Sequence, residues 1–234
     1  MSGLFILNSP PKKFHFWVGI LLLGVTLFVS SGCRTGYYAV MEKLGKHKRD
    51  LLKQSLTDAT EHQKEVEQQF KDALTRLQDL TGASGGELQE RYESFRAEYE
   101  DSKSQSERVG SHIREVEHVA TDLFAEWDSE LNEIQSATLR QKSRSKLMET
   151  RSRYEKMRPA LVNAEQAMSP VLVKMNDYVL YLKHNLNAQA IGSLKDETFR
   201  IEEEIGQLIA EMNRSIEETE AFIDILGDTS SPNN

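Results

Sequence analysis

Residues 52–80 read LKQSLTDATEHQKEVEQQFKDALTRLQDL and carry most of their apolar side chains at alternating steps of four and three residues. On an α-helix this spacing forms one narrow stripe, which is typical of helices that pack side by side. The stripe positions are Leu52, Leu56, Ala59, Gln63, Val66, Phe70, Ala73, Leu77 and Leu80. Glycines within residues 81–86 end this helix, and Ser84 with Glu87 forms a capping box that starts the next one.

The same spacing recurs in three later stretches and predicts four helices in all. Their expected ranges are 39–81, 87–135, 138–190 and 194–226. Pro159 and Pro170 fall inside the third range, and because the stripe continues past both, we expect kinks rather than chain reversals.

The predicted fold class is all-α, an elongated antiparallel four-helix bundle or coiled coil within residues 33–226. Residues 227–234 are expected to form a flexible tail. An open coiled coil that pairs with a second chain is the alternative, because the stripes are narrower than those of most monomeric bundles.

The first 32 residues have the layout of a signal peptide. They contain no Asp or Glu, carry Lys12 and Lys13, and continue with an apolar run over residues 16–29. As a helix this run would be about 21 Å long, short of the roughly 30 Å of a bilayer core. A cleaved signal peptide over residues 1–32 is therefore favoured over a permanent membrane span.

Small residues precede Cys33, the only cysteine of the chain, in the sequence Ser-Ser-Gly-Cys at 30–33. This segment resembles the bacterial lipobox, which implies cleavage after Gly32 and acylation of Cys33. Arg34 after the cysteine implies sorting to the outer membrane, on its periplasmic face. An uncleaved anchor and a secreted protein with a free thiol remain alternatives. A single cysteine excludes an intrachain disulfide.

The chain is acidic overall, with 29 Lys and Arg against 37 Asp and Glu, which disfavours binding to nucleic acid. Two basic stretches, 34–53 and 140–158, would lie at one end of an up-down bundle. Internal pairing with the acidic end of the fourth helix is the favoured interpretation, and the carboxylates there are Glu211, Glu217, Glu218, Glu220, Asp224 and Asp228. The alternative is a basic collar facing anionic headgroups or an envelope polymer, formed by Lys46, Lys48, Arg49, Arg144, Arg151 and Arg153.

The sequence predicts no catalytic residues, no cofactor and no metal site. Gly45-Lys46-His47 lacks the upstream glycine and the hydroxyl residue of a phosphate-binding loop. His112 and His118 are six residues apart on a helix, so their imidazoles cannot converge on one ion. The amides within the polar segment 184–189 are expected to cap helix ends, with ligand binding as the alternative.

Four segments, 37–45, 70–74, 123–127 and 182–191, resemble an uncharacterised family of proteobacterial lipoproteins classed as a domain of unknown function. The resemblance implies a helical coiled coil in the cell envelope and brings no catalytic residue, cofactor or partner with it.

The expected function is that of a non-enzymatic, lipid-anchored periplasmic coiled-coil protein that acts as spacer, adaptor or regulator. One alternative is an accessory subunit that modulates an envelope enzyme through residues 184–189; an enzyme is the least favoured. Expected partners are the membrane, through the acyl anchor, and an envelope protein or polymer. A homo-oligomer is an open alternative, and nucleic acid is not expected.

Overall fold

Four long α-helices make up most of the part of the chain that the computed structural model describes, residues 48–83 and 85–228. They are α3 (Lys48–Gly82), α4 (Leu88–Glu130), α5 (Ala137–His184) and α6 (Ala188–Asp228), with a short 3-10 helix, η1 (Gly85–Glu87), before α4. The predicted all-α class is confirmed. The predicted signal peptide, Gly32, Cys33, Ser84 and Lys46 lie outside the described residues, as does the tail after 228.

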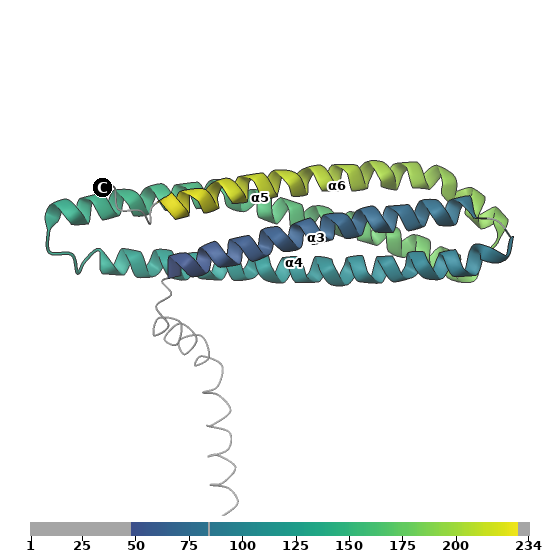
Figure 1. The fold of residues 1–234 in the computed structure, drawn as a ribbon, viewed down its shortest axis with the longest axis horizontal. Helices are drawn as coiled ribbons and strands as arrows, with labels where there is room; N and C mark the ends of the chain where they lie inside the picture. Colours follow the sequence, from purple (N-terminus) through teal and green to yellow (C-terminus); the bar gives the residue numbers. More distant parts are fainter. Residues whose placement is uncertain (1–47, 84, 229–234) are drawn as a thin grey trace, which may run out of the picture. The chain divides into compact units, whose positions relative to one another are not determined.

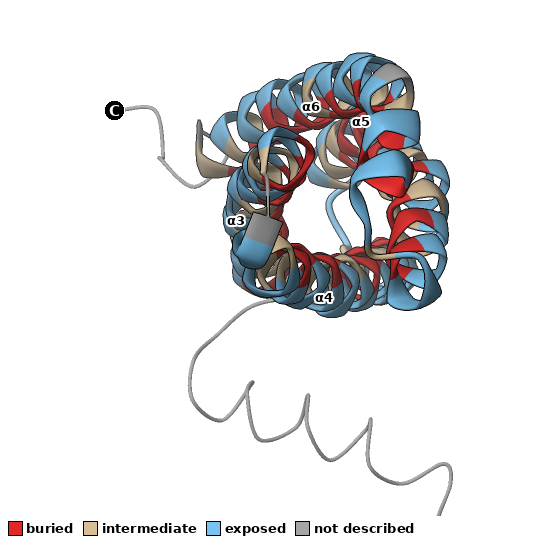
Figure 2. Ribbon diagram, turned by 90° about the vertical axis from the view of Figure 1, so that its right-hand side faces the viewer, coloured by how far each residue is buried: buried red, intermediate tan, exposed pale blue. Residues whose placement is uncertain are grey.

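The helices form an antiparallel bundle in which each one packs against two others. The neighbouring pairs are α3–α4, α4–α5, α5–α6 and α3–α6, so the last helix closes the ring against the first (Figure 1). Buried residues face the interior and exposed residues cover the outside (Figure 2). The four apolar stripes therefore close on one another within a single chain, as predicted for a four-helix bundle.

The predicted stripe residues form the core. Phe70, Leu161 and Ile205 are at most 1% exposed, and every predicted stripe position of α3 is buried. The repeat of the second predicted range also predicts Trp127 in the core, but this residue is only half-buried, and its Nε1 donates a hydrogen bond to Ser143 Oγ at 2.9 Å. The preceding residue, Glu126, pairs with Lys48 at the start of α3, so Trp127 lies near the end of the four-helix part of the bundle, where fewer helices surround it.

The connection between α4 and α5 projects past the other two helices. Lys48 Nζ, at the start of α3, is 3.2 Å from Glu126 Oε1, and α4 continues beyond that level to Glu130. At the left-hand end of Figure 1, only α4, α5 and their connection remain. We call residues 128–147 the overhang.

The turn between α4 and α5 begins earlier than predicted. Residues 131–133 form turns in which the Leu131 N–H donates to Trp127 O and the Glu133 N–H to Glu130 O. The side chain of Ser136 then caps α5 by accepting from the Leu139 N–H at 3.4 Å. The predicted helix end at 135 is therefore wrong, because the chain leaves the helix through backbone turns at 131–133 that no Gly or Pro marks in the sequence.

The turn between α5 and α6 has the predicted length but lies six residues earlier than predicted. α5 ends at His184 instead of 190, and α6 begins at Ala188 instead of 194. Asn187 Oδ1 accepts the N–H of Ala190 at 3.0 Å, and Asn185 Nδ2 donates to Tyr181 O at 2.9 Å. Both amides cap helix ends, as the capping interpretation of this segment predicted.

The two prolines do not interrupt α5, which is continuous from 137 to 184. Both Pro159 and Pro170 are exposed, so water can hydrogen-bond to the carbonyls that lose their helical partner. The prediction that neither proline reverses the chain is confirmed.

Candidate functional site

The described members of the basic collar lie on the first turn of α3 and on the N-terminal part of α5. Lys48 pairs with Glu126, as noted above. Arg144 is exposed on the overhang, together with Lys142, and neither side chain makes an ion pair or hydrogen bond within the described part of the chain. The overhang therefore carries two cations without a partner, although its four basic residues face three carboxylates, Asp128, Glu130 and Glu133, in the same segment.

The other two collar residues of α5 make local contacts. The Arg151 guanidinium carbon lies 5.3 Å from the ring centroid of Phe124 on α4, within the range of a cation–π interaction. Arg153 Nη2 is 3.1 Å from Glu149 Oε1, one turn earlier on the same helix. The hydrogen bond from Lys146, together with the neighbouring Arg153, holds the pKa of the Glu149 carboxyl below its usual value.

The predicted pairing with the end of α6 is wrong for the three arginines of α5. No described carboxylate of α6 contacts Arg144, Arg151 or Arg153; instead, Glu220 Oε1 accepts from Lys64 Nζ of α3 at 2.8 Å. The orientation of α5 in the bundle explains why these arginines do not reach α6. Arg151 faces Phe124 of α4, and Arg153 lies one turn after Glu149 on its own helix.

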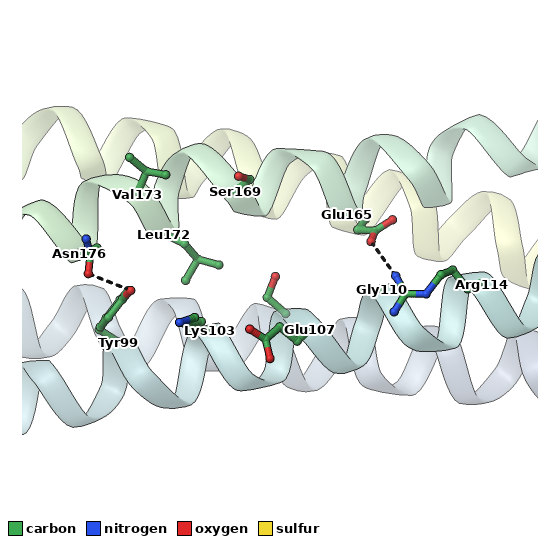
Figure 3. Close-up of a pocket in the computed structure, with 11 residues that line it drawn as sticks. Tyr99, Lys103, Glu107, Gly110, Arg114, Glu165, Ser169, Leu172, Val173 and Asn176 are labelled. Atoms are coloured by element: carbon green, nitrogen blue, oxygen red, sulfur yellow. Dashed lines mark hydrogen bonds and ion pairs between the residues drawn. The ribbon is translucent and has the colours of Figure 1, made fainter.

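A groove of about 640 Å³ runs between α4 and α5 near the middle of the bundle (Figure 3). At one end Tyr99 Oη donates to Asn176 Oδ1 at 3.1 Å. Toward the α4–α5 turn, Arg158 Nε donates to Glu117 Oε1 at 2.7 Å. We call this feature the central groove.

Small residues open the central groove, and charged residues surround it. Ser106 and Gly110 of α4 and Ser169 of α5 leave space where larger side chains would join the helices. Arg114 Nη1 is 3.9 Å from Glu165 Oε1, which lies so close to Gly110 that a Cβ there would collide with it. The sequence analysis did not predict this groove, because whether small residues leave space depends on the neighbouring helix.

Two exposed charges at the groove have no partner. Lys103 and Glu107 both line it from α4, one turn apart (Figure 3). Neither side chain makes an ion pair or hydrogen bond with any residue in 48–83 or 85–228. The groove thus combines one unpaired cation and one unpaired carboxylate with the loose Arg114–Glu165 pair.

A histidine pair joins α3 to α4. The rings of His62 and His112 are stacked, with centroids 4.1 Å apart and an interplanar angle of 26°. Burial, and then the neighbouring His62, lowers the pKa of His112 below its ordinary value. Among the described residues, no group of three or more His, Cys, Asp or Glu side chains is arranged to hold a metal ion. The sequence placed His112 on the flank of its stripe, but the partner on α3 depends on the register of the hairpin.

A polar layer crosses the core where α3 meets α6, formed by Gln63, Ser215 and Thr219. All three residues are 0% exposed. Gln63 Nε2 and Oε1, Ser215 Oγ and Thr219 Oγ1 are buried without a hydrogen-bond partner. The adjacent Lys64–Glu220 pair places Gln63 and Thr219 at similar heights in the bundle.

A family model described as "Protein of unknown function (DUF2959)" matches residues 37–226. The chain belongs to this family. The DUF2959 match starts before α3 and covers almost all of the four helices. No curated protein and no solved structure matches the chain. Within the described ranges, no helix of this DUF2959 protein is long and apolar enough to cross a membrane.

Proposed function

We propose that this DUF2959 protein is a non-enzymatic, lipid-anchored coiled-coil protein that acts as a spacer or adaptor in the periplasm. In this proposal the acylated Cys33 holds it to the periplasmic face of the outer membrane. One observation carries the proposal: α3 begins at the end of the bundle that bears the overhang, with exposed Lys142 and Arg144. The chain that leads from the anchor therefore joins the bundle at the end that bears these two unpaired cations.

The length of the connecting chain supports this arrangement. Residues 34–47 separate the predicted anchor from α3, and at about 3.3 to 3.6 Å per residue they reach at most about 50 Å. This reach lets the overhang touch the membrane to which the cysteine is attached. Leu139 of the overhang is 59% exposed, so apolar and basic side chains are both available to a headgroup region.

The length of the helices supports a spacer or adaptor. Helices of 35 to 48 residues are about 50 to 70 Å long at 1.5 Å per residue. In the proposed orientation the opposite end, with the turns at 83–87 and 185–187, faces away from the membrane toward a partner. The alternative role for segment 184–189 has less support, because Asn185 and Asn187 already cap helices.

The test is a pair of variants followed through cell fractionation. Cys33→Ser should leave the precursor uncut or release the protein from the outer membrane, because lipoprotein processing needs the thiol. Arg144→Glu, with Cys33 intact, should remain anchored and keep its melting temperature. Mass spectrometry that finds an unmodified Cys33 in the mature, membrane-bound protein would refute the anchor.

A second assay separates the collar from the anchor. The full mature chain carrying Cys33→Ser is mixed with vesicles of phosphatidylethanolamine and an anionic phospholipid, and bound protein is measured by sedimentation. We expect weak, salt-sensitive binding that Arg144→Glu reduces. No binding at low salt would remove the collar from the proposal and leave the anchor unaffected.

A further inference from the structure

α5 carries a second stripe on its outer side, in addition to the stripe buried in the core. It repeats the steps of four and three residues and consists of Val162, Gln166, Ser169, Val173, Asn176 and Leu180. Val173 is 58% exposed and Leu180 is 52% exposed. This pattern is typical of a helix that packs against another helix, yet α4 and α6 already pack against the inner side of α5.

The outer stripe borders the central groove. Ser169, Val173 and Asn176 belong to the stripe and also line the groove. Next to them, Leu172 points toward α4 (Figure 3). The opposite wall, on α4, holds Ser106 and Gly110 between the charged side chains of Lys103, Glu107 and Arg114.

The charges at the groove match those of a second copy of the same surface. The chain has a formal net charge of -8, so two copies repel each other in most orientations. At the groove, by contrast, Lys103 and Arg114 balance Glu107 and Glu165. A two-fold axis through this face brings Lys103 of one copy toward Glu107 of the other, and the reverse contact follows by symmetry.

We propose that the outer stripe of α5 and the central groove form the interface of a two-fold symmetric homodimer. The stripe supplies the apolar contact, with Val173 and Leu180 as its largest exposed side chains. Lys103 and Glu107 supply complementary charges that fix the orientation of the two copies. The proposal does not depend on the acyl anchor.

The first test measures association of the full mature chain carrying Cys33→Ser, so that neither acyl chains nor a thiol contributes. Analytical ultracentrifugation over a range of concentrations should show a monomer–dimer equilibrium. Val173→Glu should raise the dissociation constant about tenfold or more, since it puts a charge into the apolar contact. Phe199→Glu is the matched control: Phe199 is 74% exposed on α6 and does not line the groove, so its dimer should persist.

The second test exchanges the charges. Lys103→Glu alone should weaken the dimer, and adding Glu107→Lys should restore it, because the double variant recreates the complementary pairs. The melting temperature of each variant is measured at a concentration where the chain is monomeric, which separates a folding defect from a lost interface.

Three results would overturn the proposal. They are a parent chain that stays monomeric at every concentration, equal effects of Val173→Glu and Phe199→Glu, and a charge exchange that fails to restore association. If the parent is monomeric while Val173→Glu removes a crosslink to a different protein in cells, the groove binds a heterologous partner instead.

Discussion

Replacing Gln63 by leucine should stabilise the bundle. The Gln63 side chain is fully buried, and neither its amide nitrogen nor its amide oxygen has a partner. A buried polar group without a hydrogen bond costs about 1 to 3 kcal/mol. Leucine has a similar volume and a similar helix propensity, so Gln63→Leu should raise the free energy of unfolding by about 1 to 3 kcal/mol.

The measurement is chemical and thermal unfolding followed by circular dichroism. For a domain of this size, each kcal/mol should shift the melting temperature by about 2 to 4 °C. Gln69→Leu is the matched control on the same helix, because Gln69 Nε2 donates to Glu98 Oε2 at 2.7 Å. Removing that satisfied bond should cost about 0.5 to 1.5 kcal/mol. The two leucine variants should therefore move in opposite directions.

A destabilised Gln63→Leu variant would refute this reasoning. That result would mean that ordered water joins the polar layer, so the substitution would leave the partners of Gln63 unsatisfied. Ser215→Ala and Thr219→Val, alone and combined with Gln63→Leu, distinguish the two cases. If the three polar side chains are unsatisfied independently of one another, the increases in unfolding free energy from the single substitutions add in the combined variant. If ordered water joins them in one network, the combined variant deviates from that sum by a large coupling energy.

Two further predictions concern the core and the histidine pair. Phe70→Ala and Leu161→Ala should each lower the unfolding free energy by about 2 to 5 kcal/mol, whereas the half-buried Trp127→Ala should cost less; denaturant titration checks both. Because its folded pKa is lowered, His112 binds protons less readily in the folded than in the unfolded chain, so stability should fall as the pH drops below its ordinary pKa of 6.5. His112→Asn should flatten that pH dependence in melting curves, and an unchanged slope would contradict the assignment.

The inner stripes could be predicted from the sequence because one helical period determines which residues share a face. Even Gln63, a polar member of the first stripe, was placed correctly, since its position within the repeat outweighs its chemistry. Trp127 shows the limit of this reasoning. A repeat predicts the direction of a side chain, whereas its burial also depends on where the neighbouring helices end.

The turns were harder to predict because asparagine and serine caps provide a weaker signal than glycine or proline. Asn187 begins α6 six residues before the predicted start by accepting a single backbone N–H. A hydrogen bond of this kind depends on local backbone geometry, which composition does not specify. The prediction therefore placed the end of α5 and the start of α6 six residues too late, while the order of the helices was correct.

Contacts between helices depend on register, which the pattern within one helix cannot supply. The stacking of His62 on His112 and the place of Arg151 over Phe124 both require the relative heights of two helices. The central groove has the same origin, because small residues on a packing stripe indicate either close packing or open space. Only the neighbouring helix decides between these outcomes.

The start of α3 and the end of α6 lie next to each other, because α6 runs back to the end of the bundle at which α3 begins. A Cβ added at Gly227 would lie 3.4 Å from Lys53 Nζ, which shows how near the last turn of α6 is to α3. A short linker could therefore join these ends, and the chain could be reopened between the end of α3 and the start of α4. Such a circular permutant would keep the same interhelical contacts in a different order. Its new termini would emerge at the opposite end of the bundle, where a fused reporter would stay clear of the overhang.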